Sequence, residues 1–425
     1  MTRIIAYDLS RMLIGPIFAT PRGVDRVDLA LAKRVFADPE TPNLAVLPTP
    51  WGMRAYTGRG AARLLDRLQE LWSEQVDRNS DPQLAKLVER FWGPQEVVAD
   101  VHPASKFTLA RKLARIGTLL DGAGLSFGQP VRRAVPADAV YVNIGQLGLA
   151  VPMFYNWLAD RPDVTCAIML HDVIPLEHPD LVPPHAAAHH ARMVRTAADH
   201  ADCMIYNTAT ARRSVESVMR SHGRESVRSL VRALPLQNAF ASVQDGVPEL
   251  ADADYFVVVS TVEPRKNHAL LIGIWQRLMA RLGVRCPHLV IVGARGYDSD
   301  RILAPVDEDP VLSRRIHVVS GLSSPALAAL VLGSKGMLSP TRTEGFGLPV
   351  YEANALGVPT IASDIPAHRE IANAQTTLLS PDDADAWEQA IIALVPAGAR
   401  PRPAIDPRLT EEAYCADVLE FLQAA

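Results

Sequence analysis

The chain has 425 residues, of which 48% are apolar, and its 43 basic and 47 acidic side chains give a formal net charge of -4. A chain of this length exceeds the size at which one hydrophobic core usually divides, so two domains are predicted. The near balance of charge provides no broad positive field and argues against a partner nucleic acid. Four widely spaced cysteines without a CxxC pair argue against a disulfide framework and a zinc cluster, and favour a reducing compartment.

The start of the chain, residues 1–8, has the pattern of a short strand interrupted by charge rather than that of a signal peptide. Nowhere do about 18 uncharged apolar residues run together, so no conventional membrane-spanning helix is predicted. We therefore expect a cytoplasmic protein that is soluble or peripheral to a membrane.

Short apolar or β-branched runs alternate along the chain with longer segments of helical period, which is typical of a parallel sheet covered by helices. The predicted class is α/β. The strands predicted for the first half are Arg3–Tyr7, Asn43–Pro48, Ala139–Val142, Thr165–Leu170 and Cys203–Asn207. Those predicted for the second half are Tyr255–Ser260, His288–Val292, Ile316–Val319, Gly336–Leu338 and Pro359–Ala362.

Between the two halves lies Leu234–Asp254, a stretch with prolines, a glycine and scattered acids but no helical or strand period. We place the linker there, between a first domain over residues 1–245 and a second over 250–408. The helical pattern over 409–425 is expected to return to the first domain. Residues 52–136 are helical in pattern and indicate no chemistry.

A buried strand, residues 257–259, leads through Glu263-Pro264-Arg265-Lys266-Asn267 into a predicted helix over Ala269–Leu282. The carboxyl end of such a strand is where open α/β sheets bind ligands, and the next helix offers free N–H groups to an anion. Arg265 adds a planar fork that fits phosphate, and Lys266 adds a point charge. A solvated Arg-Lys pair at the start of a helix is the alternative.

The second signal is the run from Glu344 to Glu352, in which seven residues separate the two acids. Gly345 and Gly347 permit close approach of a ligand to the backbone, and Pro349 fits the first turn of a helix. One carboxylate could then reach a sugar and the other a ribose. Alone, two acids at this spacing are more often surface residues. The intervening glycines and proline favour a binding site.

At these motifs the sequence resembles the retaining glycosyltransferases of the GT-B fold, specifically the family 4-like group with a Glu-x7-Glu motif. The resemblance covers Tyr255–Asn373 and rests on residues 263–267, 292–296, 320–322, 344–352, 357–359 and 362–364. In the first half, residues 21–27 and 171–175 resemble counterparts in bacterial polysaccharide-building members. The resemblance implies two Rossmann-like domains with parallel sheets that face each other across a deep cleft.

The resemblance also implies a role for each matching residue. Arg265 and Lys266 would neutralise the diphosphate of a nucleotide sugar, and His171 and Glu344 would contact the donor sugar. Phe346, Gly347 and Leu348 would offer backbone amides to sugar hydroxyls, and Glu352 would bind the ribose. Gly321 and Leu322 would lie beside the base, and Gly23 near the diphosphate. Many members have paired glycines where this chain has Arg22 before Gly23, which leaves the contact of that loop with phosphate open.

No metal and no cofactor are expected, because the fold implied by the resemblance does not need them. Asp-x-Asp runs, among them residues 252–254, 307–309 and 383–385, match a metal-binding pattern of another glycosyltransferase fold, but nothing relates these three to Arg265 or Glu344. His185 and His189 have a spacing that can hold zinc, although the glutamate of a His-Glu-x-x-His motif is absent. We interpret them as a polar helix face.

The function predicted from the resemblance is sugar transfer from a nucleotide diphosphate sugar, GDP-mannose or a UDP-hexose, to a glycan or lipid-linked glycan. The predicted helix over residues 105–120 has one apolar and one basic face, so it could dock on the inner face of the cytoplasmic membrane or simply on its own core. Two alternatives stay open: a sugar-nucleotide epimerase on the same fold, and a binding or scaffold protein without turnover.

Overall fold

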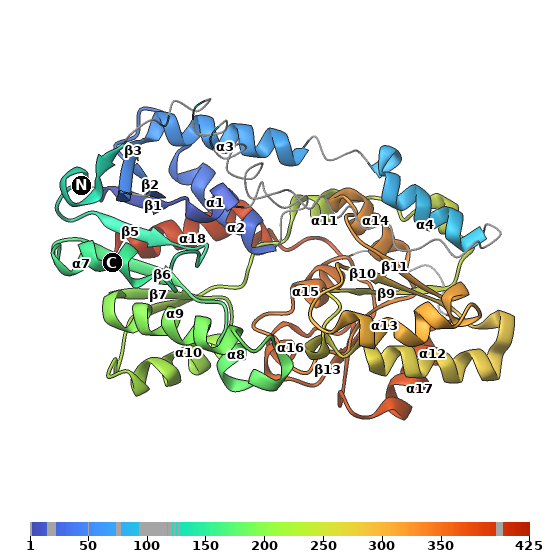
Figure 1. Cartoon of the computed structure of the whole chain (residues 1–425). Coiled ribbons are helices and arrows are strands. Elements are labelled where there is room, and N and C mark those ends of the chain that lie inside the picture. The colour runs from blue at the N-terminus through green and yellow to red at the C-terminus, as the bar shows by residue number, and fades with distance from the viewer. Residues whose placement is uncertain are drawn as a thin grey trace.

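The computed structural model describes residues 2–14, 23–49, 51–73, 78–92, 128–396 and 403–425, together with residues 117, 121 and 125. The chain builds two sheets, one from each half, which lie side by side with helices around them (Figure 1). The predicted α/β class is therefore confirmed. The predicted helix over residues 105–120 and the residue Arg22 lie outside the described residues, apart from Gly117.

The first sheet has eight strands in the order β4-β3-β2-β1-β5-β6-β7-β8. All neighbours are parallel except the pairs β2–β3 and β3–β4, which are antiparallel. The strands are β1 (Ile5–Asp8), β2 (Leu44–Thr49), β3 (Gly52–Thr57), β4 (Gln129–Pro130), β5 (Val140–Asn143), β6 (Thr165–Met169), β7 (Cys203–Tyr206) and β8 (Arg228–Val231). The α-helices of this half are α1 (Ser10–Ile14), α2 (Gly23–Val35), α3 (Gly58–Ser73), α4 (Pro82–Trp92), α6 (Val131–Ala134), α7 (Asn156–Ala159), α8 (Ile174–Glu177), α9 (Ala186–His200), α10 (Ala209–Ser221) and α11 (Asn238–Ser242).

The second sheet is parallel throughout, with six strands in the order β11-β10-β9-β12-β13-β14. Its strands are β9 (Tyr255–Val259), β10 (His288–Val292), β11 (Ile316–Val319), β12 (Gly336–Ser339), β13 (Thr360–Ser363) and β14 (Thr376–Leu379). The helices are α12 (His268–Leu282), α13 (Ser299–Glu308), α14 (Ser324–Gly333), α15 (Leu348–Ala355), α16 (Pro366–Ile371), α17 (Ala384–Leu394) and α18 (Glu411–Gln423). Because the chain goes from β9 outward to β11 and then returns to β12, the order reverses between β9 and β12.

Each of the ten predicted strands is present, with ends that differ by at most two residues. The helical interpretation of residues 52–136 is wrong at both ends, since β3 and β4 are strands. In β3 the buried Met53 and Ala55 alternate with less buried residues, as expected for a strand. Because the strand has only six residues, this period is easy to overlook in the sequence. The stretch 234–254 contains the five-residue helix α11, whose Phe240 is buried.

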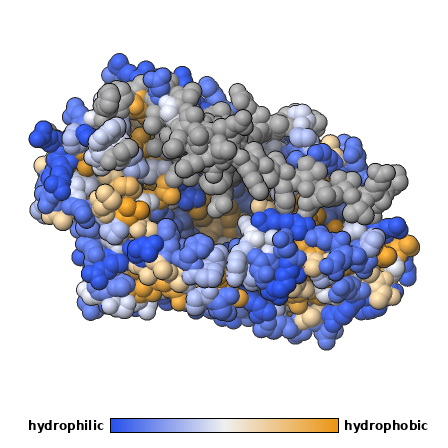
Figure 2. All heavy atoms as spheres, in the orientation of Figure 1, coloured by the Kyte–Doolittle hydropathy of each residue, from blue (hydrophilic) through white to orange (hydrophobic). Residues whose placement is uncertain are grey.

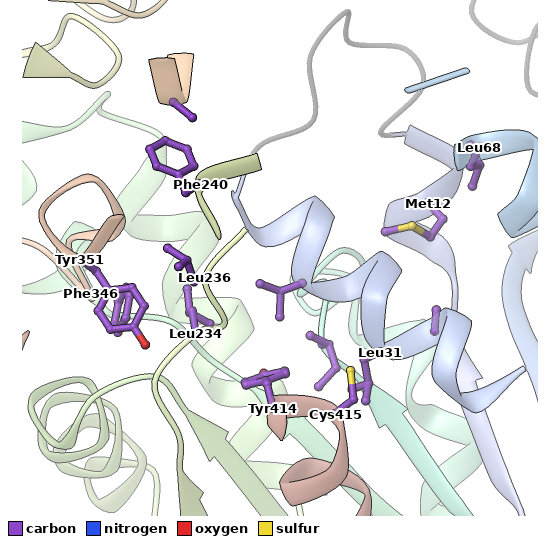
Figure 3. Close-up of a cluster of buried hydrophobic side chains, with 14 of the residues drawn as sticks. Met12, Leu31, Leu68, Leu234, Leu236, Phe240, Phe346, Tyr351, Tyr414 and Cys415 are labelled. Carbon is purple, nitrogen blue, oxygen red and sulfur yellow. The ribbon is translucent and has the colours of Figure 1, made fainter. Parts of the chain in front are cut away.

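Apolar side chains of both halves form one continuous cluster that passes through the connecting segment 234–240. Figure 3 shows Leu234 and Leu236 between Phe346 and Tyr351 of the second half and Tyr414 of α18, with Phe240 beyond Leu236. Helix α18 packs against α2 of the first half, and Leu236 N donates to Leu409 O at 2.6 Å. Separate clusters fill the other face of each sheet. The two halves thus share part of their core.

Helix α4 belongs to the first half by sequence but packs against β11, the edge strand of the second sheet (Figure 1). Its Phe91 stacks on His288 and His317, with ring centroids 4.5 and 4.6 Å away. Arg90 Nη1 donates to the carbonyl oxygen of Val318, 3.1 Å away. The helix therefore covers an edge that would otherwise expose unpaired backbone groups.

Among the described residues, no helix is both long enough and apolar enough to cross a membrane. Figure 2 shows that hydrophilic side chains predominate on the face turned to the viewer, where apolar ones gather only in separate spots. Exposed large apolar residues, such as Trp51, Met153 and Val284, are far apart in the sequence.

Asp81 joins α4 to α14, and its removal should weaken the second half. One oxygen of the buried carboxylate accepts from Gln83 N and Leu84 N, and the other accepts from Ser323 N at 2.7 Å. Because Asp81→Ala leaves two helix starts without this acceptor, we expect the free energy of unfolding to fall by about 2 kcal/mol in urea, followed by tryptophan fluorescence. The exposed control Asp252→Ala should stay within about 0.5 kcal/mol of the parent. Equal losses in both variants would contradict this role.

Candidate functional site

The segments after β9 and β12 meet where the strand order of the second sheet reverses. Arg342 N donates to the carbonyl oxygen of Arg265 at 2.9 Å, and Thr341 Oγ1 donates to the same oxygen at 3.1 Å. In open α/β sheets this switch point, at the carboxyl ends of the strands, is where ligands bind. The two motifs that sequence analysis singled out are therefore parts of one site.

Glu344 is held by both cations of the first motif. Its carboxylate accepts from Arg265 Nη1 at 3.0 Å and from Lys266 Nζ, and the three side chains are between 12% and 17% exposed. Arg265 also donates to Glu263 at 2.8 Å. Burial alone would raise the pKa of Glu344, but Lys266 and Arg265 outweigh it and hold that pKa at about 2. Glu344 is therefore ionised at neutral pH.

The loop after Glu344 needs its glycines because other atoms lie against it. A Cβ on Gly345 would lie 2.7 Å from the carbonyl oxygen of His171, which belongs to the first half. Gly347 has φ +93°, and a Cβ there would lie 2.8 Å from Cδ2 of His368. The Phe346 ring is buried and packs edge-on against Tyr351. The loop from Gly345 to Gly347 can therefore bind a ligand only through its backbone groups. Helix α15 starts directly after it, at Leu348.

His171 follows β6 and stays neutral. Its Nδ1 lies 3.5 Å from Nδ2 of Asn207, whereas its Nε2 is buried and has no hydrogen-bond partner. Burial, aided by the charge of Arg11, lowers the pKa of His171 to about 3. His171 thus has an uncharged ring with an unused nitrogen, and its backbone carbonyl group lies beside Gly345. Such a ring can bond a hydroxyl group without competing for the charges of Arg265 and Lys266.

Glu352 differs from Glu344 in environment. It is 3% exposed on α15, and its Oε1 accepts from Nε2 of Gln237 in the connecting segment at 2.6 Å. Burial raises the pKa of Glu352 to about 8, and Arg26 offsets only part of this rise. The two glutamates of the motif therefore have opposite protonation states at neutral pH.

The other predicted site residues occupy two separate places. Gly23 starts α2, and a Cβ there would lie 2.6 Å from Cδ2 of Leu348, so the N-termini of α2 and α15 are adjacent. Gly321 and Leu322 follow β11 at the outer edge of the sheet, two strands from β9. Leu322 is buried in the core. The structure thus groups Gly23 with the loop of Glu344 and leaves Gly321 and Leu322 apart.

A pocket of about 310 Å³ opens between the two halves beside Glu344. The first half contributes Asp172, Glu177 and Thr210 to its lining, and the second half contributes Arg342 and Gly345. Of these five residues, only Gly345 was expected from the sequence to lie at a ligand. Among the described residues, no group of three or more His, Cys, Asp or Glu side chains could hold a metal ion.

His368 was also missed, although it follows the end of the predicted strand over residues 359–362, where ligand-binding residues gather. It is fully buried, and its Nδ1 donates to the carbonyl oxygen of Ser363 at 2.9 Å. Its Nε2 therefore carries the lone pair, and this nitrogen has no partner. The ring supports Gly347 from the side of α16.

The pKa of Glu352 predicts a pH dependence of stability. The folded chain keeps a proton on Glu352 up to about pH 8, whereas an exposed glutamate releases it near 4.5. The free energy of unfolding contributed by this group therefore falls as pH rises through that window. Glu352→Gln cannot titrate, so its melting temperature relative to the parent should rise from pH 5 to pH 8.5 in thermal unfolding. Glu412→Gln, at an exposed position of α18, should follow the parent, and a constant difference for Glu352→Gln would disprove the assignment.

Residues 253–396 match the family model described as glycosyl transferases group 1. Serotype-specific mannosyltransferase WbdA of Escherichia coli is 29% identical over 255 residues, which are 55% of this chain and 30% of the relative. O-antigen chain mannosyltransferase B, also of Escherichia coli, is 30% identical over 138 residues, 32% of this chain and 36% of the relative. The chain thus covers about a third of the length of these curated relatives.

The fold has solved counterparts. Sucrose-phosphate synthase from Thermosynechococcus elongatus superposes with a TM-score of 0.55 over 99% of this chain and 94% of that one, at 17% identity. This likeness confirms the predicted GT-B fold, with two Rossmann-like halves. Residues 253–396, which match the model of the group 1 glycosyl transferases, thus lie within a chain of GT-B fold.

Proposed function

We propose that this chain is a retaining glycosyltransferase that moves a sugar from a nucleotide diphosphate sugar to a hydroxyl group of a growing bacterial glycan. The observation that carries the proposal is the pairing of Arg265 and Lys266 with Glu344 at the switch point of the second sheet. The family match over residues 253–396 supports it, as do the mannosyltransferase names of the relatives.

Arg265 and Lys266 form the site for the leaving diphosphate in this proposal. Both cations lie in a partly desolvated place, where their attraction for phosphate is stronger than in water. A diphosphate that binds them competes with Glu344 for the same N–H groups. The carboxylate of Glu344 is then available to accept hydrogen bonds from the donor sugar. The cations also stabilise the negative charge that grows on the phosphate as the bond to the sugar breaks.

The sugar occupies the space between Glu344, His171 and the backbone of Phe346 to Leu348 in this arrangement. The N-terminus of α15 supplies free N–H groups, because the first turn of a helix leaves them without partners. Neutral His171 offers its unused Nε2 to a sugar hydroxyl. Positive charge that develops on the sugar ring is stabilised by ionised Glu344.

The nucleotide extends from this point toward the other predicted residues. Glu352 binds the ribose. Because Gln237 donates to the same carboxyl group, the ribose either replaces Gln237 as its partner or binds beside it. The N-terminus of α2 at Gly23 approaches the diphosphate from the first half. Gly321 and Leu322 contact the base. No metal takes part.

We favour a mannosyl donor, GDP-mannose, over UDP-hexoses, since the relatives are named mannosyltransferases. The acceptor is a glycan or a lipid-linked glycan, and the enzyme works in the cytoplasm at the inner face of the membrane. In the reaction, the bond between the anomeric carbon and the phosphate oxygen breaks and a bond to the acceptor oxygen forms on the same face. The acceptor proton passes to the departing phosphate.

Loss of either charge should reduce turnover strongly. Lys266→Ala and Glu344→Ala each remove a group that acts on charge in the transition state, so we expect kcat to fall by about a hundredfold or more. Sugar transfer from a radiolabelled donor gives the rate, and circular dichroism confirms the fold. Lys335→Ala is the matched control, because the Lys335 ammonium pairs with Asp254 at the opposite end of the strands. Rates near that of the control in folded variants would refute the roles of Lys266 and Glu344.

A panel of GDP-, UDP- and ADP-sugars tests the donor and the reaction class. We expect thermal stabilisation and slow hydrolysis with GDP-mannose, transfer only when an acceptor glycan is added, and an α-linked product by NMR from the α-linked donor. The same rate is expected in EDTA. Conversion of the donor sugar without any acceptor would indicate an epimerase instead, and binding without turnover would indicate a scaffold.

A further inference from the structure

Thr208 joins the first half to the loop of Glu344 in the second half. It is the N-cap of α10, where its hydroxyl oxygen accepts from Ala211 N at 2.9 Å. The same hydroxyl donates to the carbonyl oxygen of Gly345, also at 2.9 Å, and Thr208 is 2% exposed. One buried side chain therefore caps a helix of the first half and bonds the residue next to Glu344.

Glu370 makes a second connection from the opposite direction. It lies on α16 of the second half, and its carboxylate accepts from Ala209 N and Thr210 N of α10, both at 2.7 Å. The hydroxyl of Thr210 donates to it as well. The first N–H groups of a helix lack partners within the helix and attract negative charge, so a carboxylate from the other half is a suitable cap.

The connections made by Thr208 and by Glu370 meet at the two ends of the loop over residues 345–347. Thr208 bonds Gly345, while α16 carries His368, whose ring lies against Gly347, in addition to Glu370. Thr210 and Gly345 also line the pocket between the halves. The N-terminus of α10 is thus fixed directly to the loop of Glu344 and also to α16, the helix that supports this loop.

We propose that Thr208 and Glu370 are positioning residues that dock the first half on the second and hold the loop of Glu344 in its reactive arrangement. We name the bonds of Thr208 to Gly345 and of Glu370 to residues 209–210 the cross-cleft contact. The inference rests on the proposed function, because it assigns the contact to sugar transfer.

Peptide geometry explains why this contact matters for the site. A peptide unit is planar, so the carbonyl group of Gly345 and the N–H group of Phe346 point in opposite directions. The Thr208 hydroxyl fixes the direction of that carbonyl group and thereby the direction of the Phe346 N–H, one of the amides assigned to the sugar.

Two substitutions of Thr208 separate the contact from helix capping, and a third substitution removes the contact of Glu370. Thr208→Asp keeps an oxygen that can cap α10 but has no proton for Gly345 at neutral pH. Thr208→Ser keeps both bonds, and Glu370→Ala removes the second connection. Glu216→Gln is the control on α10, because Glu216 pairs with Arg212 of the same helix.

We expect kcat for sugar transfer to fall about tenfold or more in Thr208→Asp and Glu370→Ala, which corresponds to the loss of one hydrogen bond in the transition state. The Kd for GDP should change by less than about threefold, because these substitutions leave the diphosphate site unaltered. Loss of a hydrogen bond to GDP itself would change the Kd by more than this. Thr208→Ser and Glu216→Gln should keep kcat within about twofold of the parent. Parental kcat in both Thr208→Asp and Glu370→Ala would overturn the proposal.

Hydrogen exchange followed by mass spectrometry separates this proposal from the proposed function. Without the cross-cleft contact, peptides that cover residues 342–348 should exchange faster in Thr208→Asp and Glu370→Ala, and not in Glu216→Gln. This readout needs no donor, so it holds even if the parent transfers no sugar and the proposed function fails. Unchanged exchange over residues 342–348 would overturn the positioning role whatever the activity.

Discussion

The mutual neutralisation of Arg265, Lys266 and Glu344 is the interaction on which the site depends. These three charges are largely withdrawn from water, and each would be costly to bury without the others. Removal of one partner leaves an uncompensated buried charge, so these residues hold the carboxyl edge of the second sheet together as well as serving the proposed chemistry. An arriving diphosphate can replace Glu344 as the counter-charge. The site therefore binds an anion by exchanging one partner for another.

The same physics gives the two glutamates of the motif different properties. Both are buried, but Glu344 faces two cations and has its pKa lowered to about 2, whereas Glu352 has the amide of Gln237 as its neighbour and its pKa is raised to about 8. Spacing in the sequence could not predict this difference. It depends on side chains that are 78 and 115 residues away in the chain. The environment divides the pair into a charged acid and a neutral one.

Sequence reasoning was most successful where the signal is local. The strand runs, the start of α15 at Leu348 and the proximity of the two motifs at the strand ends follow from periodicity, proline preference and the rule for parallel sheets. It failed where tertiary contacts decide. The strands β3 and β8 are short edge or near-edge strands with mixed polarity, and nothing in the sequence of α4 indicates that Phe91 stacks on two neighbouring histidines of the other half. Thr208 and Glu370 escaped notice for the same reason, because each is an ordinary polar residue until the chain folds.

The connections between the halves differ in kind from one side of the molecule to the other. On the linker side, Leu234, Leu236 and Phe240 belong to an apolar cluster shared by both halves, and its exposure to water would cost about 25 cal/mol for each Å². On the side of α10, the cross-cleft contact consists of hydrogen bonds, and water can replace each at a net cost of about 1 kcal/mol. A separation of the halves would therefore break the polar side and pivot on the apolar side. Donor and acceptor can then enter next to the loop of Glu344 while the shared apolar cluster stays packed.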